Sequence, residues 1–339
     1  MRHYSCIAED IKGGIRVDRY AAENLALMSR SQMKTRSFKV VCNGREVRLS
    51  RLVKDGDRLE FSWADAESPA LLPEDLPLDI IYEDENVVVV NKAQGMIVHP
   101  GAGVFRGTLA NAILFRQLRR RGLSGDGAHS GVPSGADQAG KAGSAGLPPG
   151  AEQKPRGTAE ALRPGIVHRL DKDTSGVIIA AYDERTLAFL AEQFKTRKVK
   201  KCYAAIVQGT PQDKEGSIET FIGRDLRNRK LFAVSDRGGK PAFTRYKAIR
   251  SWNVKGTAYT LLLIRPATGR THQIRVHMSF LGHPVLGDPL YGKADPLFQS
   301  LSLMLHSKSL TIRLPHAGGE VTFSTPLPGR FREFIRRFE

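Results

Sequence analysis

The stretch GIVHRLDKDTSGVIIAAY, residues 165–182, joins a polar segment to an apolar one. Its second half, GVIIAAY, is a short apolar run, which predicts a buried strand. Its first half, HRLDKDTSG at residues 168–176, places two acids, two bases and two hydroxyls around Asp171. The strand fixes where this cluster stands in the fold, and the cluster raises the question of which chemistry Asp171 serves.

Two known uses of such a segment are excluded by the residues around it. In a calcium loop that starts at Asp171, position 12 should be a bidentate glutamate, but Tyr182 stands there. A phosphorylated aspartate would need a nucleotide-binding apparatus, and the sequence has no G-x-x-x-x-G-K-[ST] motif. A polar turn before a strand explains the second half of the segment but not the charged residues ahead of it. A carboxylate that acts directly on a substrate remains.

The charge of the chain is its most informative bulk property. Of 339 residues, 52 are Lys or Arg and 35 are Asp or Glu, which gives a formal net charge of +17. Such a field favours RNA or DNA as a partner, although a basic protein without a nucleic-acid partner has the same composition. No apolar run reaches the ~18–20 residues of a membrane span, and the first residues lack the apolar core of a signal peptide. Cys6, Cys42 and Cys202 have neither disulfide nor zinc spacing. We expect a cytoplasmic protein.

Residues 1–63 have the pattern of a small basic module, with 13 Lys or Arg and 8 Asp or Glu. In KVVCNGREV, the pair Asn43-Gly44 predicts a hairpin turn. Ser29 and Ser31 are candidate N-caps of a short helix. The acidic, proline-rich residues 64–77 are expected to form a linker.

A low-complexity segment lies at about residues 118–160. Residues 121–150 include 21 Gly, Ala, Ser or Pro among 30 and no aromatic residue. This composition cannot bury enough apolar surface to offset the entropy of ordering. We expect an insertion within one domain, residues 78–339, because parts of one pattern lie on both sides of it.

The rest of residues 78–339 combines strand patterns with a few helical ones. An apolar face around Leu190 predicts a helix capped by Asp183, and residues 271–284 predict a second helix with Thr271 as its N-cap. Alternating runs such as AFTRYKAIRSW and GTAYTLLLIRPATG predict antiparallel strands. The expected fold class is α+β, with a mixed, largely antiparallel sheet.

GIVHRLDKDTSG resembles the signature of the RluA/RluD-type RNA pseudouridine synthases, and further motifs follow in the order of that family. YEDENVVVVNKAQGMIVHPGAG resembles its first motif, with Ala93 where proline is usual. KCYAAIVQG resembles the strand with the family's tyrosine, and RPATGRTHQIRVHMSFLGHPVLGDPLYG resembles its third motif. The resemblance covers about residues 78–330, and residues 1–63 resemble the alpha-L RNA-binding domain. It implies a catalytic domain of pseudouridine synthase type with a small N-terminal α/β RNA-binding domain.

The resemblance implies an enzyme that isomerises uridine without metal or organic cofactor. It assigns Asp171 as the carboxylate that acts on the nucleoside, Arg275 as its basic partner and Tyr203 as the aromatic residue beside the uracil. We expect Arg275 to hold Asp171 with a bidentate fork, which fixes the direction of a carboxylate. Whether Asp171 attacks the sugar, attacks the base or drives glycal formation stays open. The histidines of the third motif lack the spacing and further ligands of a metal site.

Candidate RNA contacts come from the resemblance and from the charge. Arg169 resembles the family residue that helps to occupy the space left by a flipped uridine. The other candidates are basic or polar residues near the motifs or in the amino-terminal module: His168, Lys240, Arg270, His272, Arg30, Ser31, Gln32, Lys34 and Arg36.

The resulting interpretation is an enzyme that converts uridines of large-subunit (23S) ribosomal RNA to pseudouridine, with transfer RNA as an alternative substrate. We expect a monomer that acts on ribosomal precursor particles. The alternative from another class is a non-catalytic RNA-binding or ribosome-assembly factor. Such a factor would have no need to keep Asp171, Tyr203 and Arg275 together.

Overall fold

The computed structural model of the chain describes residues 1–9, 11, 13–28, 30, 33, 37–64, 71–101, 104–122, 165–225, 228, 231–236, 238–292, 295–298 and 300–338. The chain divides into two compact units, residues 1–70 and 71–339, each with its own core. Outside the described residues lie four predicted RNA contacts, Ser31, Gln32, Lys34 and Arg36, and the predicted insertion from residue 123 onward.

The unit of residues 1–70 is built on a four-stranded antiparallel sheet with the order β1-β6-β3-β4 and a separate strand pair, β2-β5. Its elements are β1 (Arg2–Ile7), β2 (Ile15–Arg16), α1 (Val17–Arg19), the π-helical turn η1 (Tyr20–Asn24), β3 (Lys39–Cys42), β4 (Arg45–Val47), β5 (Leu52–Val53) and β6 (Arg58–Trp63). Strand β6 alternates as a half-buried strand should, since Leu59, Phe61 and Trp63 are buried while Arg58 and Glu60 are exposed.

The turn between β3 and β4 is the hairpin that the Asn-Gly pair predicts. Asn43 and Gly44 have φ of 52° and 77°, and Cys42 lies opposite Arg45 across the strand pair. A positive φ at both turn residues is what a type I′ turn requires, and asparagine and glycine adopt it most readily. The predicted hairpin is confirmed.

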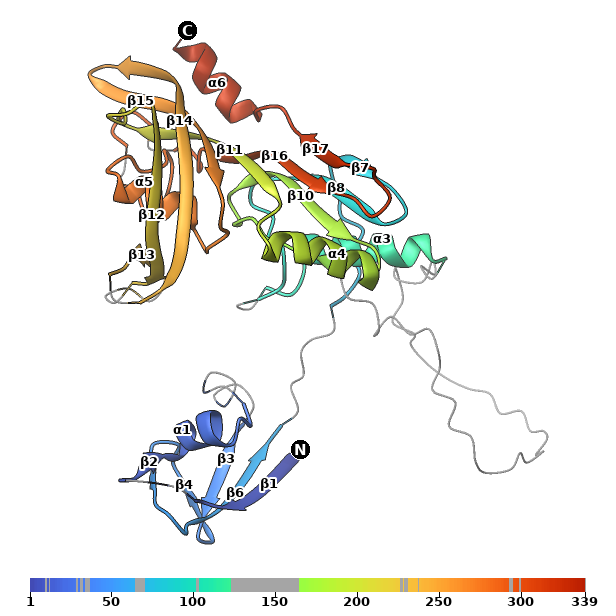
Figure 1. The fold of residues 1–339 in the computed structure, drawn as a ribbon, viewed down its shortest axis with the longest axis vertical. Helices are drawn as coiled ribbons and strands as arrows, with labels where there is room; N and C mark the ends of the chain where they lie inside the picture. Colours follow the sequence, from blue (N-terminus) through green and yellow to red (C-terminus); the bar gives the residue numbers. More distant parts are fainter. Residues whose placement is uncertain are drawn as a thin grey trace, which may run out of the picture. The chain divides into compact units, whose positions relative to one another are not determined.

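The unit of residues 71–339 contains, in its described part, a mixed sheet with the order β13-β12-β14-β15-β11-β16-β10-β8-β7, with β17 beside β16 and β9 beside β10 (Figure 1). Its strands are β7 (Ile80–Glu83), β8 (Val87–Lys92), β9 (Gly165–Ile166), β10 (Ser175–Ala181), β11 (Lys200–Gln208), β12 (Glu215–Arg224), β13 (Phe232–Val234), β14 (Lys240–Val254), β15 (Thr257–Pro266), β16 (Leu305–Arg313) and β17 (Glu320–Ser324). Its helices are α3 (Leu109–Arg120), α4 (Glu184–Lys195), α5 (Gln273–Phe280) and α6 (Gly329–Arg337). Strands β10 and β16 pair in parallel, and the other paired strands run antiparallel. The sheet is therefore largely antiparallel, as predicted.

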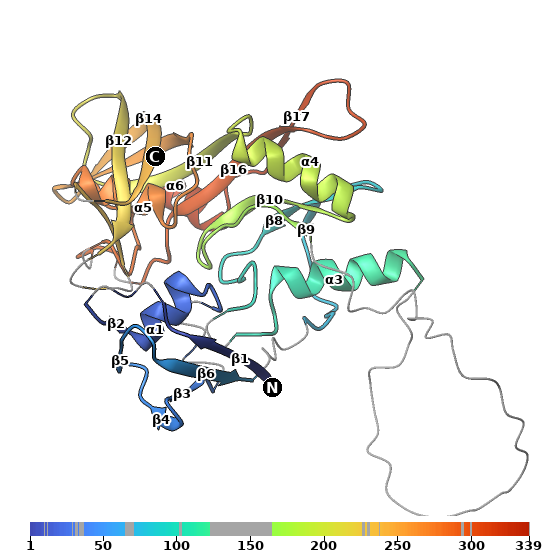
Figure 2. The same ribbon diagram turned by 60° about the horizontal axis from the view of Figure 1, so that its bottom comes forward.

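Strand β10 is buried along its whole length because helices cover both faces of the sheet there. Val177 and Ile179 belong to one hydrophobic cluster, which includes Leu190 of α4. Ile178 belongs to another, which includes Ile113 of α3. The two helices lie on opposite sides of β10 in Figure 2. A strand with both faces covered needs apolar residues at every position, which explains the uninterrupted run that the sequence shows.

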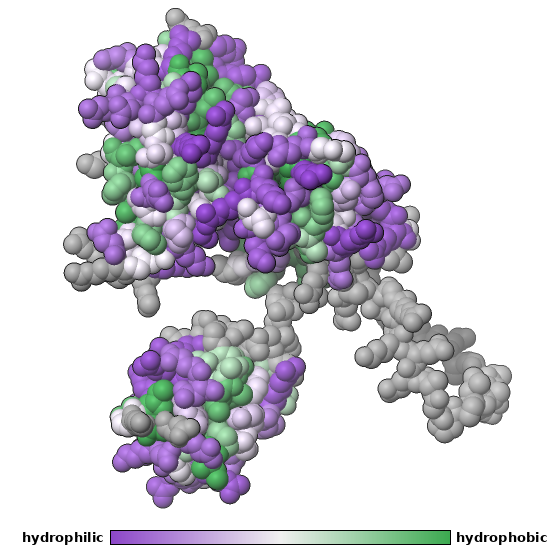
Figure 3. Space-filling model, in the orientation of Figure 1, coloured by the Kyte–Doolittle hydropathy of each residue, from purple (hydrophilic) through white to green (hydrophobic). Residues whose placement is uncertain are grey.

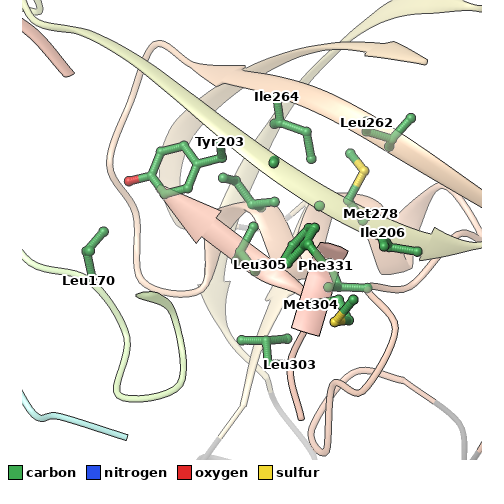
Figure 4. Close-up of a cluster of buried hydrophobic side chains, with 14 of the residues drawn as sticks. Leu170, Tyr203, Ile206, Leu262, Ile264, Met278, Leu303, Met304, Leu305 and Phe331 are labelled. Carbon is green, nitrogen blue, oxygen red and sulfur yellow. The ribbon is translucent and has the colours of Figure 1, made fainter. Parts of the chain in front are cut away.

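The largest core of this unit lies around the middle of the sheet, where β11, β15 and β16 meet α5 and α6. Its members include Ile206, Leu262, Ile264, Met278 and Phe331, which Figure 4 shows converging from these elements. On the face seen in Figure 3, hydrophilic residues cover much of the unit and hydrophobic ones form smaller patches. None of the helices in the described ranges has the length and apolar character needed to cross a bilayer.

Helix α5 begins one residue later than predicted. The residue at its N-cap is His272, in the left-handed region at φ 54° and ψ 18°, and not Thr271. The side chain of Gln273 organises the helix start instead, since its Oε1 accepts from the backbone N–H of Arg270 at 3.0 Å and from the Thr268 hydroxyl at 2.7 Å. No side chain caps the helix, and Gln273 instead holds the residues that lead into it.

Helix α3 precedes the predicted insertion and overlaps its expected start. The insertion was placed from about residue 118, whereas α3 continues to Arg120. The helix begins at a capping box formed by Thr108 and Asn111. Leu118 is buried, so the last turn of this helix packs on the unit and does not belong to the low-complexity segment.

Gly176 is the residue of β10 whose substitution we expect to damage the fold most. Its φ is 114°, and a Cβ added there would lie 2.2 Å from the Ser307 carbonyl oxygen of the neighbouring β16. Gly176→Ala should therefore lower the free energy of unfolding of this unit by at least about 3 kcal/mol, through overpacking and backbone strain. Urea denaturation should be followed by the fluorescence of Trp252 in a Trp63→Phe background, because these are the two tryptophans of the chain.

The matched control is Gly318→Ala, since a Cβ at Gly318 meets no atom within 4 Å. We expect that variant to unfold within about 0.5 kcal/mol of the parent. Equal urea midpoints for the two alanine variants would show that the close approach of β10 to β16 does not constrain residue 176.

Candidate active site

A pocket of about 590 Å³ opens in the unit of residues 71–339, in front of the segment that precedes β10. Its walls come from residues 167–174, the end of α4, the start of β11 and residues 266–275. The charged residues that line it are one carboxylate, Asp171, and six cations: Arg169, Lys195, Arg197, Lys201, Arg270 and Arg275. The pocket therefore combines a single acid with a strongly positive surround.

The guanidinium of Arg275 is the buried centre of this site. Arg275 is 5% exposed, and its Nε and Nη2 each donate to Asp288 at 2.7 Å. Its Nη1 donates to Asp171 Oδ2 at 3.2 Å. The expected pairing of Asp171 with Arg275 is present, but the bidentate fork is on Asp288 and not on Asp171. Asp171 thus keeps most of its carboxylate free toward the pocket.

Asp288 was not anticipated from the sequence, although it lies in the segment VLGDPLYG that extends the third motif. Its side chain is fully buried, and its Oδ1 also accepts the backbone N–H groups of Leu290 and Tyr291 at 2.9 and 3.1 Å. A buried arginine needs a buried acid nearby, because an unpaired charge in the interior is very costly. This requirement is the one signal that could have suggested a partner in this segment.

His272 lies on the other side of Asp171. Its Nε2 is 3.9 Å from Asp171 Oδ1, and its Nδ1 is 2.8 Å from the hydroxyl of Tyr291. Burial lowers the pKa of His272 despite the opposing effect of the Asp171 carboxylate. The Tyr291 hydroxyl accepts from the Phe232 N–H at 3.0 Å, so we assign its own proton to the His272 Nδ1. A neutral His272 then presents Nε2–H toward Asp171.

Tyr203 forms an aromatic wall of the pocket. Tyr203 is 9% exposed and belongs to the main core, while Figure 4 shows its hydroxyl pointing away from Ile264 and Leu305. Burial and the nearby Asp171 carboxylate raise the pKa of Tyr203 to about 12, although a hydrogen bond with Ser307 acts in the opposite direction. The phenol is therefore protonated near neutral pH, and it offers a flat face and a hydrogen-bond donor.

His168 lines the pocket, but its ring supports the fold. Its Nε2 accepts the backbone N–H of Ile179 at 3.1 Å, and its ring stacks on Phe194 with centroids 4.6 Å apart. Burial, together with the ammonium of Lys201, lowers the pKa of His168 to about 3. With Nε2 as an acceptor, the neutral imidazole has its proton on Nδ1 and no charge to attract a phosphate, and the RNA contact at His168 stays a prediction.

The other predicted contacts are only partly brought together. Arg169 is exposed and Arg270 half-buried, and both line the pocket with Asp171. Lys240 is exposed at the start of β14, away from the pocket lining. Arg30 lies in the other unit, where it pairs with Asp18 at 3.0 Å while its side chain stays 56% exposed.

Two side chains from the end of β8 and the residues after it hold the backbone directly after Asp171. The Nζ of Lys92 is buried and donates to the carbonyls of Ala93, Met96 and Lys172 at 2.8, 2.9 and 3.1 Å. Gln94 donates to the carbonyl of Asp173 at 2.9 Å. Burial lowers the pKa of Lys92 to about 8. The segment NKAQG was part of the first motif, but nothing in the sequence assigns its lysine to this task.

A second support comes from the carboxy-terminal helix. The Nη2 of Arg330, in α6, donates to the Ser175 hydroxyl at 2.7 Å and to the Leu305 carbonyl at 3.1 Å. The same hydroxyl lies 2.8 Å from Nδ1 of His306. Burial lowers the pKa of Arg330 to about 10 and that of His306 to about 4. Ser175 directly follows the polar segment, so α6 fixes the place where the strand begins.

The ion pair of Arg275 with Asp288 should be essential for stability. Asp288→Ala leaves the guanidinium buried with only its single bond to Asp171, and we expect a loss of about 3–5 kcal/mol in the free energy of unfolding. Glu215→Ala is the control, because it removes the partner of Lys247 from an exposed pair and should cost less than about 1 kcal/mol. Urea denaturation monitored through Trp252 measures both, and equal losses would mean that Asp288 does not neutralise a buried charge.

Comparison with known proteins adds independent evidence. The family model described as RNA pseudouridylate synthase matches residues 86–280. The ribosomal large subunit pseudouridine synthase D of Borreliella burgdorferi is 38% identical over 333 residues, which cover 96% of this chain and 90% of that protein. The protein of the same name from Zymomonas mobilis is 38% identical over 76% of this chain and 71% of its own length.

Solved structures agree at the level of the fold. Human RNA Pseudouridylate Synthase Domain Containing 4 has a TM-score of 0.53 at 24% identity and covers 76% of this chain and 92% of its own. Human RNA Pseudouridylate Synthase Domain Containing 1 has a TM-score of 0.51 at 24% identity, over 78% of this chain and 95% of its own. The predicted α+β fold and the resemblance to RluA/RluD-type enzymes are confirmed, and the chain belongs to the RNA pseudouridylate synthase family.

Proposed function

We propose that this RNA pseudouridine synthase acts on specific uridines of large-subunit ribosomal RNA, with Asp171 as its catalytic carboxylate and without metal or organic cofactor. The observation that carries the proposal is the arrangement of Asp171 in the pocket. Its carboxylate is tied to Arg275 by one hydrogen bond of 3.2 Å and faces a pocket that Tyr203 also lines. The names of two relatives, which specify the large ribosomal subunit, support this choice of substrate.

The reaction changes which atom of uracil is joined to the ribose. The bond between C1′ and N1 breaks, a bond between C1′ and C5 forms, a proton leaves C5, and a proton ends on N1. Whether the carboxylate attacks the sugar, attacks the base or drives glycal formation, it must be ionised and held at the nucleoside. Arg275 donates a hydrogen bond to the Asp171 carboxylate and fixes its direction, and Asp288 holds Arg275 in place.

The aromatic and cationic walls suit a nucleotide taken out of its helix. The face of Tyr203 can pack against uracil, and its protonated hydroxyl can donate to the base. Flipping a uridine costs a few kcal/mol, and less in a loop. Arg169 is exposed beside Asp171, where it can enter the space that the base leaves.

The cellular setting follows from the substrate. We propose that the enzyme works as a monomer in the cytoplasm, on ribosomal precursor particles in which the target uridine is still accessible. A net charge of +17 suits a partner with a dense phosphate backbone. The three free cysteines suit a reducing compartment.

Asp171→Asn should abolish isomerisation while RNA binding stays within about threefold of the parent, because the substitution removes the charge but not the shape. Unmodified large-subunit rRNA and total transfer RNA are incubated in EDTA with parent enzyme or variant, and pseudouridines are mapped. Asp173→Asn is the control, because it removes a carboxylate two residues away and should leave activity near the parental level. We expect at least about a thousandfold loss for Asp171→Asn, or ~4 kcal/mol in the transition state.

Several outcomes would contradict parts of this proposal. Activity of Asp171→Asn within tenfold of the parent would remove the carboxylate from the mechanism. Modification of transfer RNA alone would exclude ribosomal RNA as the substrate. Activity that EDTA abolishes and a divalent metal restores would contradict the reaction without metal.

A further inference from the structure

Lys201 and Arg270 form a pair of cations in the pocket wall that the catalytic proposal does not use. Both line the pocket that contains Asp171. Lys201 Nζ donates to the Thr268 carbonyl at 3.1 Å, and Arg270 Nε donates to the Pro241 carbonyl at 3.0 Å. Among the described residues neither forms an ion pair with a carboxylate, because the two acids of the site are held by Arg275.

The two cations repel one another. Burial and, to a smaller extent, the charge of Arg270 together lower the pKa of Lys201 to about 8. Lys201 is half-buried, and its ammonium has no carboxylate partner among the described residues, so its charge is partly removed from water without compensation, which is costly. An anion that enters the pocket would compensate the charge of the Lys201 ammonium and reduce its repulsion with Arg270. The pair is therefore suited to a negatively charged ligand.

The unused donors of the pair match the oxygens of a phosphate. Lys201 uses one of its three N–H groups on Thr268, and Arg270 uses Nε on Pro241, which leaves its two terminal nitrogens for a ligand. Guanidinium and ammonium groups side by side can hold both non-bridging oxygens of a phosphodiester. A Cβ added at Gly269 would lie 3.8 Å from Lys201 Nζ, so a side chain there would occupy space beside the ammonium.

Two other polar groups of the pocket are already engaged. The donors of Arg275 are committed to Asp288 and Asp171. His168, next to Lys201, is neutral with Nε2 occupied. The pocket therefore has two electrostatically different parts, one a carboxylate held by a guanidinium and the other a pair of cations without an acid.

We propose that Lys201 and Arg270 form a subsite for one phosphodiester group of the RNA, close to the nucleotide on which Asp171 acts. This inference rests on the proposed function, because it takes the pocket as the place where the target nucleotide binds. Lys201 is a positioning residue in this scheme. It fixes the backbone next to the uridine and does not touch the reacting atoms.

The first test measures how binding to a 23S rRNA transcript depends on salt, with full-length chains that carry Asp171→Asn to prevent turnover. Adding Lys201→Met should reduce the slope of log Kd against log salt by about 0.7–0.9, the value for one phosphate contact. Affinity should fall about tenfold, while Lys201→Arg should restore slope and affinity.

Lys200→Met is the matched control for the salt test. It removes the same charge one residue away, where the ammonium pairs with Glu320 and not with the pocket. This variant should keep the slope of the parent. An unchanged slope for Lys201→Met, or an equal change for Lys200→Met, would overturn the subsite.

The second test identifies the phosphate, using a short synthetic RNA that contains the uridine found by mapping. Its linkages around that uridine are replaced one at a time by neutral methylphosphonates. One replacement should weaken binding by the parent about as much as Lys201→Met does. Combined with that variant, it should cause no further loss, because partners in one contact are not additive. Full additivity at every linkage would overturn the contact.

The two proposals fail in different ways. A parent enzyme that modifies no ribosomal or transfer RNA contradicts the proposed function, and the salt slope of Lys201→Met still decides whether the pair binds phosphate. A parent enzyme that is active, with a variant whose salt slope is unchanged, contradicts the subsite alone.

Discussion

Arg275 is a buried cation placed between two carboxylates of different exposure, and the site is organised by that difference. Asp288 is fully buried and takes the bidentate contact, so it neutralises the guanidinium inside the protein. Asp171 is partly exposed and takes a single contact. If the fork were on Asp171, both of its oxygens would be engaged and the acid would be less available to a nucleoside. Because Asp288 compensates the charge of the buried arginine, Asp171 contributes only one hydrogen bond to it.

The backbone of the Asp171 segment is fixed by residues far away in the sequence. Lys92, 80 residues before Lys172, bonds to its carbonyl, and Arg330, 155 residues after Ser175, bonds to its hydroxyl. These contacts require β8, β10 and β16 to be neighbours and α6 to return to the sheet. The parallel pairing of β10 with β16, which needs glycine at residue 176, is part of the same requirement. The fold therefore serves to bring distant supports to one short segment.

The sequence could predict those features that depend on local pattern. The apolar run of β10 and the Asn43-Gly44 turn follow from periodicity and turn chemistry, and the grouping of Asp171, Tyr203 and Arg275 follows from motifs. It could not predict contacts that arise only when distant segments meet. The role of Asp288 depends on where the turn after it packs against α5, and that of Lys92 on which carbonyls surround its amine. Thr271 has the residue type of an N-cap, but the N-cap position is taken by His272 in the left-handed region, and no side chain caps the helix.

The pocket contains a carboxylate, although its proposed substrate is itself negatively charged. An RNA backbone brings negative charge toward a carboxylate, and like charges repel one another. Six cations line the pocket around Asp171, but their tasks differ. Arg275 is committed to the acids and stabilises the charge of Asp171 whether or not RNA is present. Within the part of the chain that the structure describes, Lys201 and Arg270 pair with no acid, and in our proposal they neutralise a phosphate. Separate cations would then perform the two tasks, so that the negative charge of the substrate is screened without weakening the ion pair that holds the carboxylate.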